Sequence, residues 1–253
     1  MSARAHDNQR LMKRIRTLHT SSDGVFGSPR MWEELRYEGE TCSRNRVARL
    51  MRVNGIQGVP QRKRWRKKAS GQRPTDIRNH LSRDFTATQT NAKWVTDITY
   101  IRTAEGWLYL CVVLDLHTKQ VIGWSMSRRQ QRSMVLQAVL MALWQREECT
   151  PVILHSDRGT QFTSDEYQRF LVGHNLTCSM SAVGSCADNA AAESFFGLLK
   201  RDRVYRRQYL TREEARADVF DYIERFHNPR MRRRMERRAA ENANLTQASV
   251  ESG

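Results

Sequence analysis

The segment from residue 94 to residue 203 constrains the fold most, because its hydrophobic pattern changes partway along. The first part is rich in Val, Ile, Thr, Tyr and Trp, which is typical of strands joined by hairpin turns. The three strands predicted there are Trp94–Arg102, Trp107–Leu116 and Gln120–Met126. The second part alternates helical and strand patterns. Its predicted elements are a helix at 130–146, a strand at Pro151–Ser156, a helix at Ser164–Gly173, a strand at Leu176–Met180 and a helix at 189–203. This order predicts an α/β fold in which helices flank a mixed five-stranded sheet.

A small all-α region is predicted ahead of this segment. Its three helices are expected within residues 8–20, at Pro29–Tyr37, and between Ser43 and the Asn54-Gly55 pair. Ser43 is a suitable N-cap, and Asn54 and Gly55 tolerate the left-handed backbone that ends a helix. The last of these helices is basic, with Arg44, Arg46, Arg49 and Arg52. A DNA-binding helix-turn-helix unit and any other small helical bundle account for this spacing equally well.

The formal charge of +16 is concentrated toward the two ends of the chain. Residues 1–80 carry 19 Lys/Arg against 7 Asp/Glu, and residues 225–238 carry 7 Arg against one Glu, whereas residues 81–224 carry 17 of each sign. Scattered charge is usually solvated surface, but this asymmetry favours contact with a polyanion such as DNA. The run at 61–74, QRKRWRKKASGQRP, has almost nothing to bury, which predicts a linker that binds phosphate.

Cysteine use and hydropathy indicate the compartment. The five cysteines form no CxxC pair, and their odd number suggests reduced thiols rather than a disulfide framework. The longest apolar stretch, around Trp107–Leu116, is interrupted by Asp115 and is much too short to span a membrane. We therefore expect a soluble intracellular protein with no membrane partner.

Three acidic residues stand where core formation does not explain them. Asp97 lies mid-strand in WVTDITYI, Asp157 follows the apolar strand VILHS, and Glu193 lies in a helix among alanines and phenylalanines. Burying carboxylates in such surroundings is costly unless a cation compensates them. Neighbouring strands and a helix packed across them could bring the three together. Their hard oxygens suit Mg²⁺ or Mn²⁺, and two such ions about 4 Å apart can drive phosphoryl transfer at a DNA phosphodiester.

A single Asp at a strand end is more often a turn or cap residue, and two further acids are interpreted in that way. Asp115 precedes the predicted His117-Thr118 turn, and Asp188 is placed to cap the helix at 189–203. His155 lies beside Asp157 in the sequence, but a lone histidine is more often structural.

The three acidic segments together resemble a known family. WVTDITYI, LHSDRGTQFTS and ADNAAAESFFGLLK are similar, in order, to the acidic motifs of insertion-sequence transposases related to retroviral integrases. Between Asp157 and Glu193 lie 35 residues, the spacing characteristic of that group, and Lys200 falls seven residues after Glu193, where the family has a basic residue. Seven residues are two helical turns, about 10 Å along the same face. The similarity runs from about residue 10 to residue 229 and is closest to the second-frame (orfB-type) product of two-frame elements.

The resemblance implies a ribonuclease-H-like fold preceded by a helix-turn-helix-like domain. It implies a DDE-type transposase that cleaves and joins DNA strands, with Asp97, Asp157 and Glu193 as catalytic metal ligands for two Mg²⁺ ions, Mn²⁺ being an alternative. The implied partners are insertion-sequence ends and target DNA, a homo-oligomer on DNA, and an upstream-frame partner or fusion in the bacterial cytoplasm, at the nucleoid. Residues expected to contact DNA are Lys200, Arg44, Arg46, Arg49, Arg62, Lys63, Arg64, Arg66, Lys67 and Lys68.

The predicted organisation has four parts. They are a helix-turn-helix-like domain at 1–58, a basic linker at 59–87, a catalytic core at 88–228 and an atypical basic C-terminal tail at 229–253. After Pro229 the sequence lacks the basic-His stretch and Leu-Ser-Pro motif that the family usually has. Two alternative functions stay open: a catalytically defective DNA-binding regulator of transposition, and a ribonuclease-H-type nuclease.

Overall fold

A computed structural model describes residues 2–60, 81, 86–146, 150–157, 159, 161–180 and 189–251. These residues fall into two compact units, one within Met1–Trp65 and Glu236–Gly253 and the other within Arg66–Met235. Most of the predicted basic linker lies outside the described residues, and so do Asp188 and Cys186. The boundaries proposed from the sequence stay predictions.

The first unit contains the three predicted N-terminal helices, α1 (Ala3–Ser21), α2 (Ser28–Tyr37) and α3 (Arg44–Val53). The N-cap at Ser43 is confirmed, since its hydroxyl accepts a hydrogen bond from the Arg46 backbone N–H at 3.3 Å. Gly55 has φ +66°, the left-handed conformation expected just past the helix. Each helix contributes fully buried side chains to the core, among them Ile15, Leu35 and Val47.

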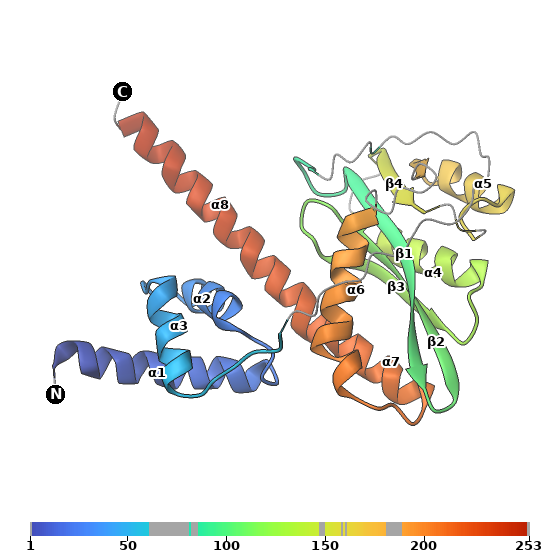
Figure 1. Cartoon of the computed structure of the whole chain (residues 1–253). Coiled ribbons are helices and arrows are strands. Elements are labelled where there is room, and N and C mark those ends of the chain that lie inside the picture. Colours follow the sequence, from blue (N-terminus) through green and yellow to red (C-terminus); the bar gives the residue numbers. More distant parts are fainter. Residues whose placement is uncertain are drawn as a thin grey trace. The chain divides into compact units, whose positions relative to one another are not determined.

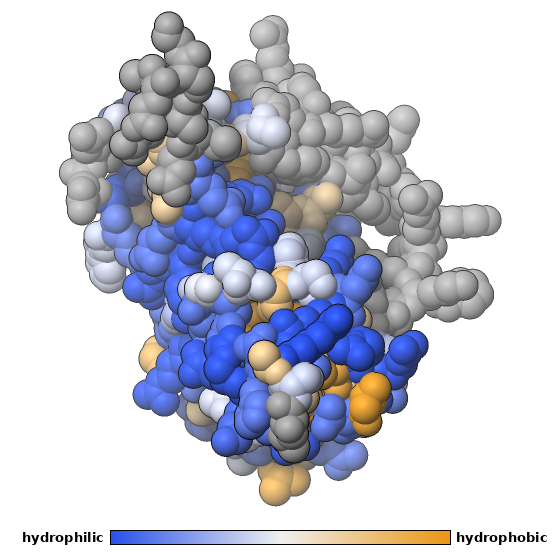
Figure 2. Space-filling view, turned by 90° about the vertical axis from the view of Figure 1, so that its left-hand side faces the viewer, coloured by the Kyte–Doolittle hydropathy of each residue, from blue (hydrophilic) through white to orange (hydrophobic). Residues whose placement is uncertain are grey.

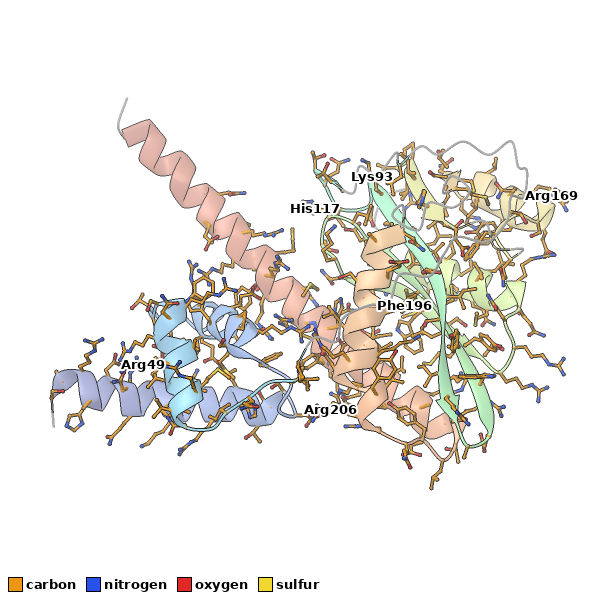
Figure 3. The ribbon with its side chains drawn as sticks, in the orientation of Figure 1. Arg49, Lys93, His117, Arg169, Phe196 and Arg206 are labelled. Atoms are coloured by element: carbon orange, nitrogen blue, oxygen red, sulfur yellow. The ribbon has the colours of Figure 1, made fainter. Side chains whose placement is uncertain are left out.

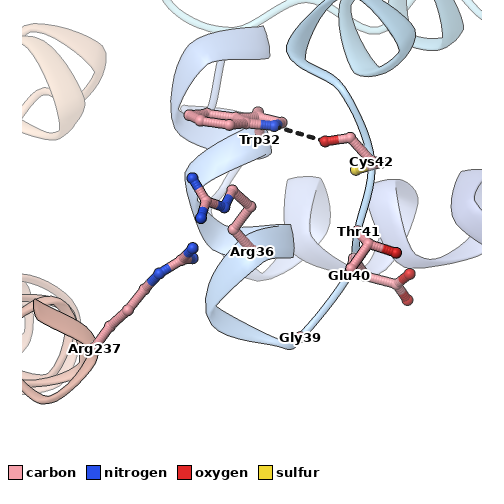
Figure 4. A pocket seen from close by; sticks show the side chains of 7 residues that line it. All are labelled: Trp32, Arg36, Gly39, Glu40, Thr41, Cys42 and Arg237. Atoms are coloured by element: carbon pink, nitrogen blue, oxygen red, sulfur yellow. Dashed lines mark hydrogen bonds between the residues drawn. The ribbon is translucent and has the colours of Figure 1, made fainter. Parts of the chain in front are cut away.

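The loop between α2 and α3 is fixed by the indole of Trp32, whose N–H donates to the Cys42 carbonyl at 2.9 Å (Figure 4). The same unit includes the later part of α8 (Asn228–Glu251), where Glu241 accepts from Arg36 at 3.4 Å and from Arg237 at 2.8 Å. The segment after Pro229 is therefore helical through Glu251, and the hydrogen bond from Arg36 to Glu241 connects its later part to α2.

The second unit is built on a five-stranded sheet with the order β3-β2-β1-β4-β5 (Figure 1). Its strands are β1 (Lys93–Thr103), β2 (Gly106–Asp115), β3 (Val121–Ser127), β4 (Val152–Ser156) and β5 (Leu176–Met180). The first three strands pair antiparallel, whereas β4 pairs parallel with β1 and β5 parallel with β4. The predicted mixed sheet of three hairpin strands and two crossover strands is confirmed.

Helices cover both faces of this sheet. On one face α6 (Ala190–Asp202) and α7 (Arg212–Asp221) bury apolar side chains, including Phe196, which Figure 3 labels. On the other face lie α4 (Arg132–Trp144) and α5 (Asp165–Gly173). A Cβ on Gly123 would lie 2.1 Å from the Ala138 carbonyl oxygen, so β3 and α4 approach so closely that only glycine fits there.

Polar contacts fix the outer edge of the sheet. After α7 the chain continues through a π-helical stretch, Tyr222–His227, into α8. The Asn228 side chain accepts from the Val121 N–H and donates to the Val121 carbonyl, both at 2.9 Å. The side chain thereby satisfies both backbone groups of a β3 residue, so the start of α8 is fixed to the sheet.

Asp115 has the turn role predicted for it. One carboxyl oxygen accepts hydrogen bonds from the backbone N–H groups of His117 and Thr118, and the other accepts from the Asn91 N–H at 2.7 Å. His155 is fully buried, and its Nδ1 lies 2.9 Å from the Ser179 hydroxyl, as expected for a structural histidine. No described helix is long and apolar enough to cross a membrane.

Candidate active site and nucleic-acid interface

The sheet register aligns two of the three singled-out acids. Val95 of β1 pairs with His155 of β4 in a parallel ladder. Asp97 lies two residues after Val95, and Asp157 lies two residues after His155. The pairing itself ends at Val95 and His155, so Asp97 and Asp157 both stand just past the paired part of β1 and β4.

The electrostatics of Asp97 link all three acids. Its pKa is raised from the ordinary value of 3.8 to about 7, mainly by burial and in addition by the negative charges of Asp157 and Glu193. The Ile98 backbone N–H, which donates to the carboxylate at 2.7 Å, and the Lys200 ammonium oppose this rise in the pKa. Asp97 is thus a buried carboxylate whose negative charge a bound cation would compensate.

The other two acids approach Asp97 from different elements. Asp157 directly follows β4 and is solvent-accessible, yet the protein around its carboxyl group removes enough water to raise its pKa. The Gly159 backbone N–H donates to this carboxylate at 3.0 Å and works against that rise in the pKa. Glu193 lies in the first turn of α6, half-buried, where the helix dipole favours a negative charge.

One polar residue next to α6, Asn189, was not predicted from the sequence as part of the site. Asn189 is the N-cap of α6, only 5% exposed, and its side-chain oxygen accepts no hydrogen bond from a described residue. It stands one helical turn before Glu193, so both side chains lie on the same face of α6. The sequence does indicate it, because Asn189 and Glu193 in ADNAAAES have the i, i+4 spacing of side chains on one helix face. A lone Asn before a helix, however, is usually interpreted as a cap.

The three carboxylates are not yet arranged as a finished metal site. In the described part of the chain, no group of three or more His, Cys, Asp or Glu side chains is close enough to hold an ion. Asp157 and Glu193 thus lie near enough to act on the pKa of Asp97, yet the three side chains are too far apart to share an ion. Such a cluster can close around an ion once the ion's charge removes the mutual repulsion.

Lys200 lies on α6 two turns beyond Glu193, as its spacing predicted. Its ammonium lies 4.8 Å from the centroid of the Tyr100 ring on β1, in a cation–π contact. Because the same ammonium acts on the pKa of Asp97, Lys200 lies close enough to influence the acidic cluster.

The arginines of α3 differ in their surroundings. Arg46 is held within its own unit by Asp7 at 2.8 Å and by Asn8 at 2.7 Å. Arg44 lies over the Trp32 ring at 6.0 Å. Arg49, labelled in Figure 3, is exposed, and within the described residues it has no ion-pair or hydrogen-bond partner.

Arg52 is exposed like Arg49, although it was not among the residues predicted to contact DNA.

The face shown in Figure 2 is mostly hydrophilic, with hydrophobic residues only in small separate patches. The linker residues expected to contact DNA lie outside the described residues; they are Arg62, Lys63, Arg64, Arg66, Lys67 and Lys68.

Family models match most of the chain. A model of the integrase core domain matches residues 87–186, a second integrase-core model matches residues 193–246, and a model of an HTH-like domain matches residues 6–64. The second match continues past Pro229, where the sequence departs from the family's usual motif. The HTH-like match also decides between the two interpretations of the N-terminal helices in favour of a helix-turn-helix-like domain. With the sheet order above, these matches define a protein that has an HTH-like domain followed by an integrase core domain.

Two curated relatives identify the family. The chain is 44% identical over 205 residues to Transposase InsF for insertion sequence IS3A of Escherichia coli (strain K12). This match covers 81% of this chain and 71% of the relative. It is 36% identical over 222 residues to the transposase for insertion sequence element IS904 of Lactococcus lactis subsp. lactis (strain IL1403), covering 86% of each. The chain belongs to the IS3 family of insertion-sequence transposases.

Solved structures with a similar trace include integrase and transposase catalytic domains. The HTLV-2 integrase catalytic core domain in complex with magnesium has a TM-score of 0.42 at 18% identity, covering 54% of this chain and 89% of that one. The catalytic domain of Mos1 mariner transposase has a TM-score of 0.42 at 12% identity, and the match covers 53% of this chain and 70% of that one.

Proposed function

We propose that this transposase cleaves and joins DNA strands by a DDE-type, metal-dependent mechanism, with Asp97, Asp157 and Glu193 as its metal ligands. The observation that carries the proposal is the raised pKa of Asp97, which has burial, Asp157 and Glu193 as its causes. A protein gains nothing in stability by holding three acids together, so such a cluster points to a functional site.

The residues present fit a hard divalent cation. The donors are carboxylate oxygens, with no Cys or His among them, and this set suits Mg²⁺ or Mn²⁺ rather than Zn²⁺. The side-chain oxygen of Asn189, which accepts no hydrogen bond from a described residue, adds a neutral oxygen one turn from Glu193. A pair of such ions, when bound, would polarise the scissile phosphodiester and lower the pKa of the attacking hydroxyl.

The chain's own residues orient the ligands and the DNA. Asp97 and Asp157 each stand two residues past the last β1–β4 pair, Val95 and His155, and Glu193 comes from α6 in the covering layer. The Ile98 and Gly159 N–H groups each donate to one carboxylate and so limit its rotation. Lys200 supplies a positive charge toward the substrate phosphate, about 10 Å along α6 from Glu193.

Three carboxylate-to-amide variants test the assignment: Asp97→Asn, Asp157→Asn and Glu193→Gln. Each change keeps the size of the side chain and removes its charge, so each variant should lose Mg²⁺-dependent joining of a pre-cut insertion-sequence end to target DNA. DNA binding should stay near the wild-type level. Asp165→Asn is the matched control, because Asp165 is an exposed acid in the first turn of α5 and should leave joining unchanged. Full joining activity in any one of the three variants would remove that residue from the metal site.

The same assay separates two alternatives. A catalytically defective regulator would bind DNA in a salt-sensitive way, yet the wild-type chain would neither cut nor join it in Mg²⁺. A ribonuclease-H-type nuclease would cut RNA–DNA hybrids but would not join a DNA 3′-hydroxyl to a target. The basic helix-turn-helix-like domain favours a DNA substrate. We further propose that the chain acts as an oligomer on DNA together with an upstream-frame partner or fusion, in the bacterial cytoplasm at the nucleoid.

A further inference from the structure

Two large aromatic side chains lie exposed on the β1–β2 hairpin, whose first strand also carries Asp97. Tyr100 of β1 is 49% exposed and Trp107 of β2 is 45% exposed. Their ring centroids are 5.1 Å apart at an interplanar angle of 80°, an edge-to-face contact that leaves ring surface open to solvent. Exposing this much aromatic surface on a rigid strand pair suggests that a planar ligand covers it.

Positive charge flanks the Tyr100–Trp107 pair. The Lys200 ammonium lies 4.8 Å from the centroid of the Tyr100 ring. Arg102 stands directly opposite Trp107 in the β1–β2 register, is exposed, and has no ion-pair partner among the described residues. The nearest acid of the hairpin, Glu105, is held by Arg212 at 3.7 Å and does not neutralise Arg102.

The hairpin that carries the pair is firmly supported. Besides its ion pair with Glu105, the Arg212 side chain donates to the Trp107 carbonyl at 3.1 Å. The Ala104 N–H donates to the Tyr209 carbonyl at 2.9 Å, so the hairpin is fixed to the segment before α7 (Figure 1). The Tyr100–Trp107 pair is therefore pre-organised, which lowers the entropic cost of stacking a ligand on it.

The pair lies within reach of the candidate active site along an open strand edge. β4 pairs with β1 only over Lys93–Val95, so apart from an isolated bridge at Thr103 no described strand pairs with that edge from Thr96 onward. Tyr100 is three residues beyond Asp97, about 10 Å along the strand, and the odd separation places the two side chains on opposite sides of β1. Lys200 links the two sides, because its ammonium contacts the Tyr100 ring and also acts on the pKa of Asp97. The distance along β1 equals about three nucleotide steps of a DNA strand.

We propose that the Tyr100–Trp107 pair is a stacking site for an unpaired base of the DNA substrate, with its phosphate held between Lys200 and Arg102. Aromatic rings beside cations are how proteins hold single-stranded nucleic acid without reading its sequence. The site holds a base splayed out of the duplex near the reacting phosphate. This inference rests on the proposed function for its biological meaning, but the binding itself needs neither metal nor catalysis.

Binding of the full-length protein to a 12-nucleotide single strand and to a 20-base-pair duplex, measured by fluorescence anisotropy in EDTA, tests the site. Trp107→Ala and Tyr100→Ala should each weaken single-strand binding about tenfold, the range expected for losing one stacked base. Duplex binding should stay within about twofold of wild type. Tyr100→Phe keeps the ring and should bind the single strand as wild type does.

Trp144→Ala is the matched control, because Trp144 is an 82% exposed tryptophan at the end of α4, away from the hairpin. It should change neither affinity. The proposal is overturned if Trp107→Ala binds the single strand normally, if it loses single-strand and duplex binding equally, or if Trp144→Ala shows the same loss. Since no metal is present, these results do not depend on whether the carboxylates catalyse joining, which the amide variants test separately.

Discussion

Replacing Asp97 with asparagine should make the metal-free protein more stable while destroying its function. A pKa raised from 3.8 to about 7 means that ionising Asp97 costs roughly 4 kcal/mol more in the folded protein than in the unfolded chain. An asparagine oxygen can still accept the Ile98 N–H that now donates at 2.7 Å, but the amide remains a partly buried polar group. We therefore expect Asp97→Asn to raise the free energy of unfolding by about 2 to 4 kcal/mol at pH 8.

The stability gained by Asp97→Asn should increase as the pH rises. Between about pH 4 and pH 7 the folded protein keeps a proton on Asp97 that the unfolded chain has lost, so wild-type stability falls as the pH rises. The gain from Asp97→Asn should therefore be largest near pH 8 and should disappear toward pH 4. Thermal unfolding in EDTA measures it, since a gain of 2 kcal/mol raises the Tm by about 4 to 8 °C in a domain of this size.

Asp115→Asn serves as the control for this stability prediction, because Asp115 is a fully buried acid of the same sheet. Both of its oxygens accept backbone N–H groups, so the amide would leave donors unpaired and should lower stability by about 1 to 3 kcal/mol. Mg²⁺ should raise the Tm of wild type but not that of Asp97→Asn. An Asp97→Asn protein that is no more stable than wild type at pH 8, or equally stabilised at pH 5 and pH 8, would refute the reasoning.

Three further predictions concern DNA contacts and the ligand cluster. Lys200→Ala should weaken DNA binding severalfold while leaving Mn²⁺ affinity unchanged in a metal titration, and unaltered DNA affinity would make Lys200 ordinary helix surface. Arg49→Ala should lower the slope of the logarithm of the DNA-binding constant against the logarithm of the salt concentration by about one, as expected for a lost phosphate contact. Arg46→Ala should mainly lower the Tm, because Arg46 forms an ion pair with Asp7. Asn189→Ala should reduce strand joining at least tenfold with little change in Tm; joining at the wild-type rate would restrict Asn189 to a capping role.

The order of the elements was predictable because it depends on local hydrophobic pattern. The β-rich stretches and the alternation that follows them predicted all five strands, and Ser43 and Gly55 marked the limits of α3. The helical state of the chain after Pro229 was not predicted. Six arginines there suggested only a basic tail, yet α8 continues to Glu251.

The candidate site was predictable in its members but not in its geometry. Asp97 and Asp157 could be singled out because apolar strands surround them, whereas their alignment depends on the β1–β4 register, which is a tertiary property. The same limit explains Tyr100 and Trp107, which look like ordinary strand residues until the hairpin is seen to expose them. Likewise, only the folded chain shows that Arg46 is occupied by Asp7 and Asn8.

The most direct test of the central claim is a Mn²⁺ titration of the full-length protein on DNA, followed by the electron paramagnetic resonance signal of free Mn²⁺. Wild type should remove about two ions per active site from solution, as expected for a two-metal centre. Asp97→Asn, Asp157→Asn and Glu193→Gln should each bind fewer ions or bind them much more weakly, while Asp165→Asn matches wild type. Binding at the wild-type level in all three amide variants would contradict a shared metal site formed by these carboxylates.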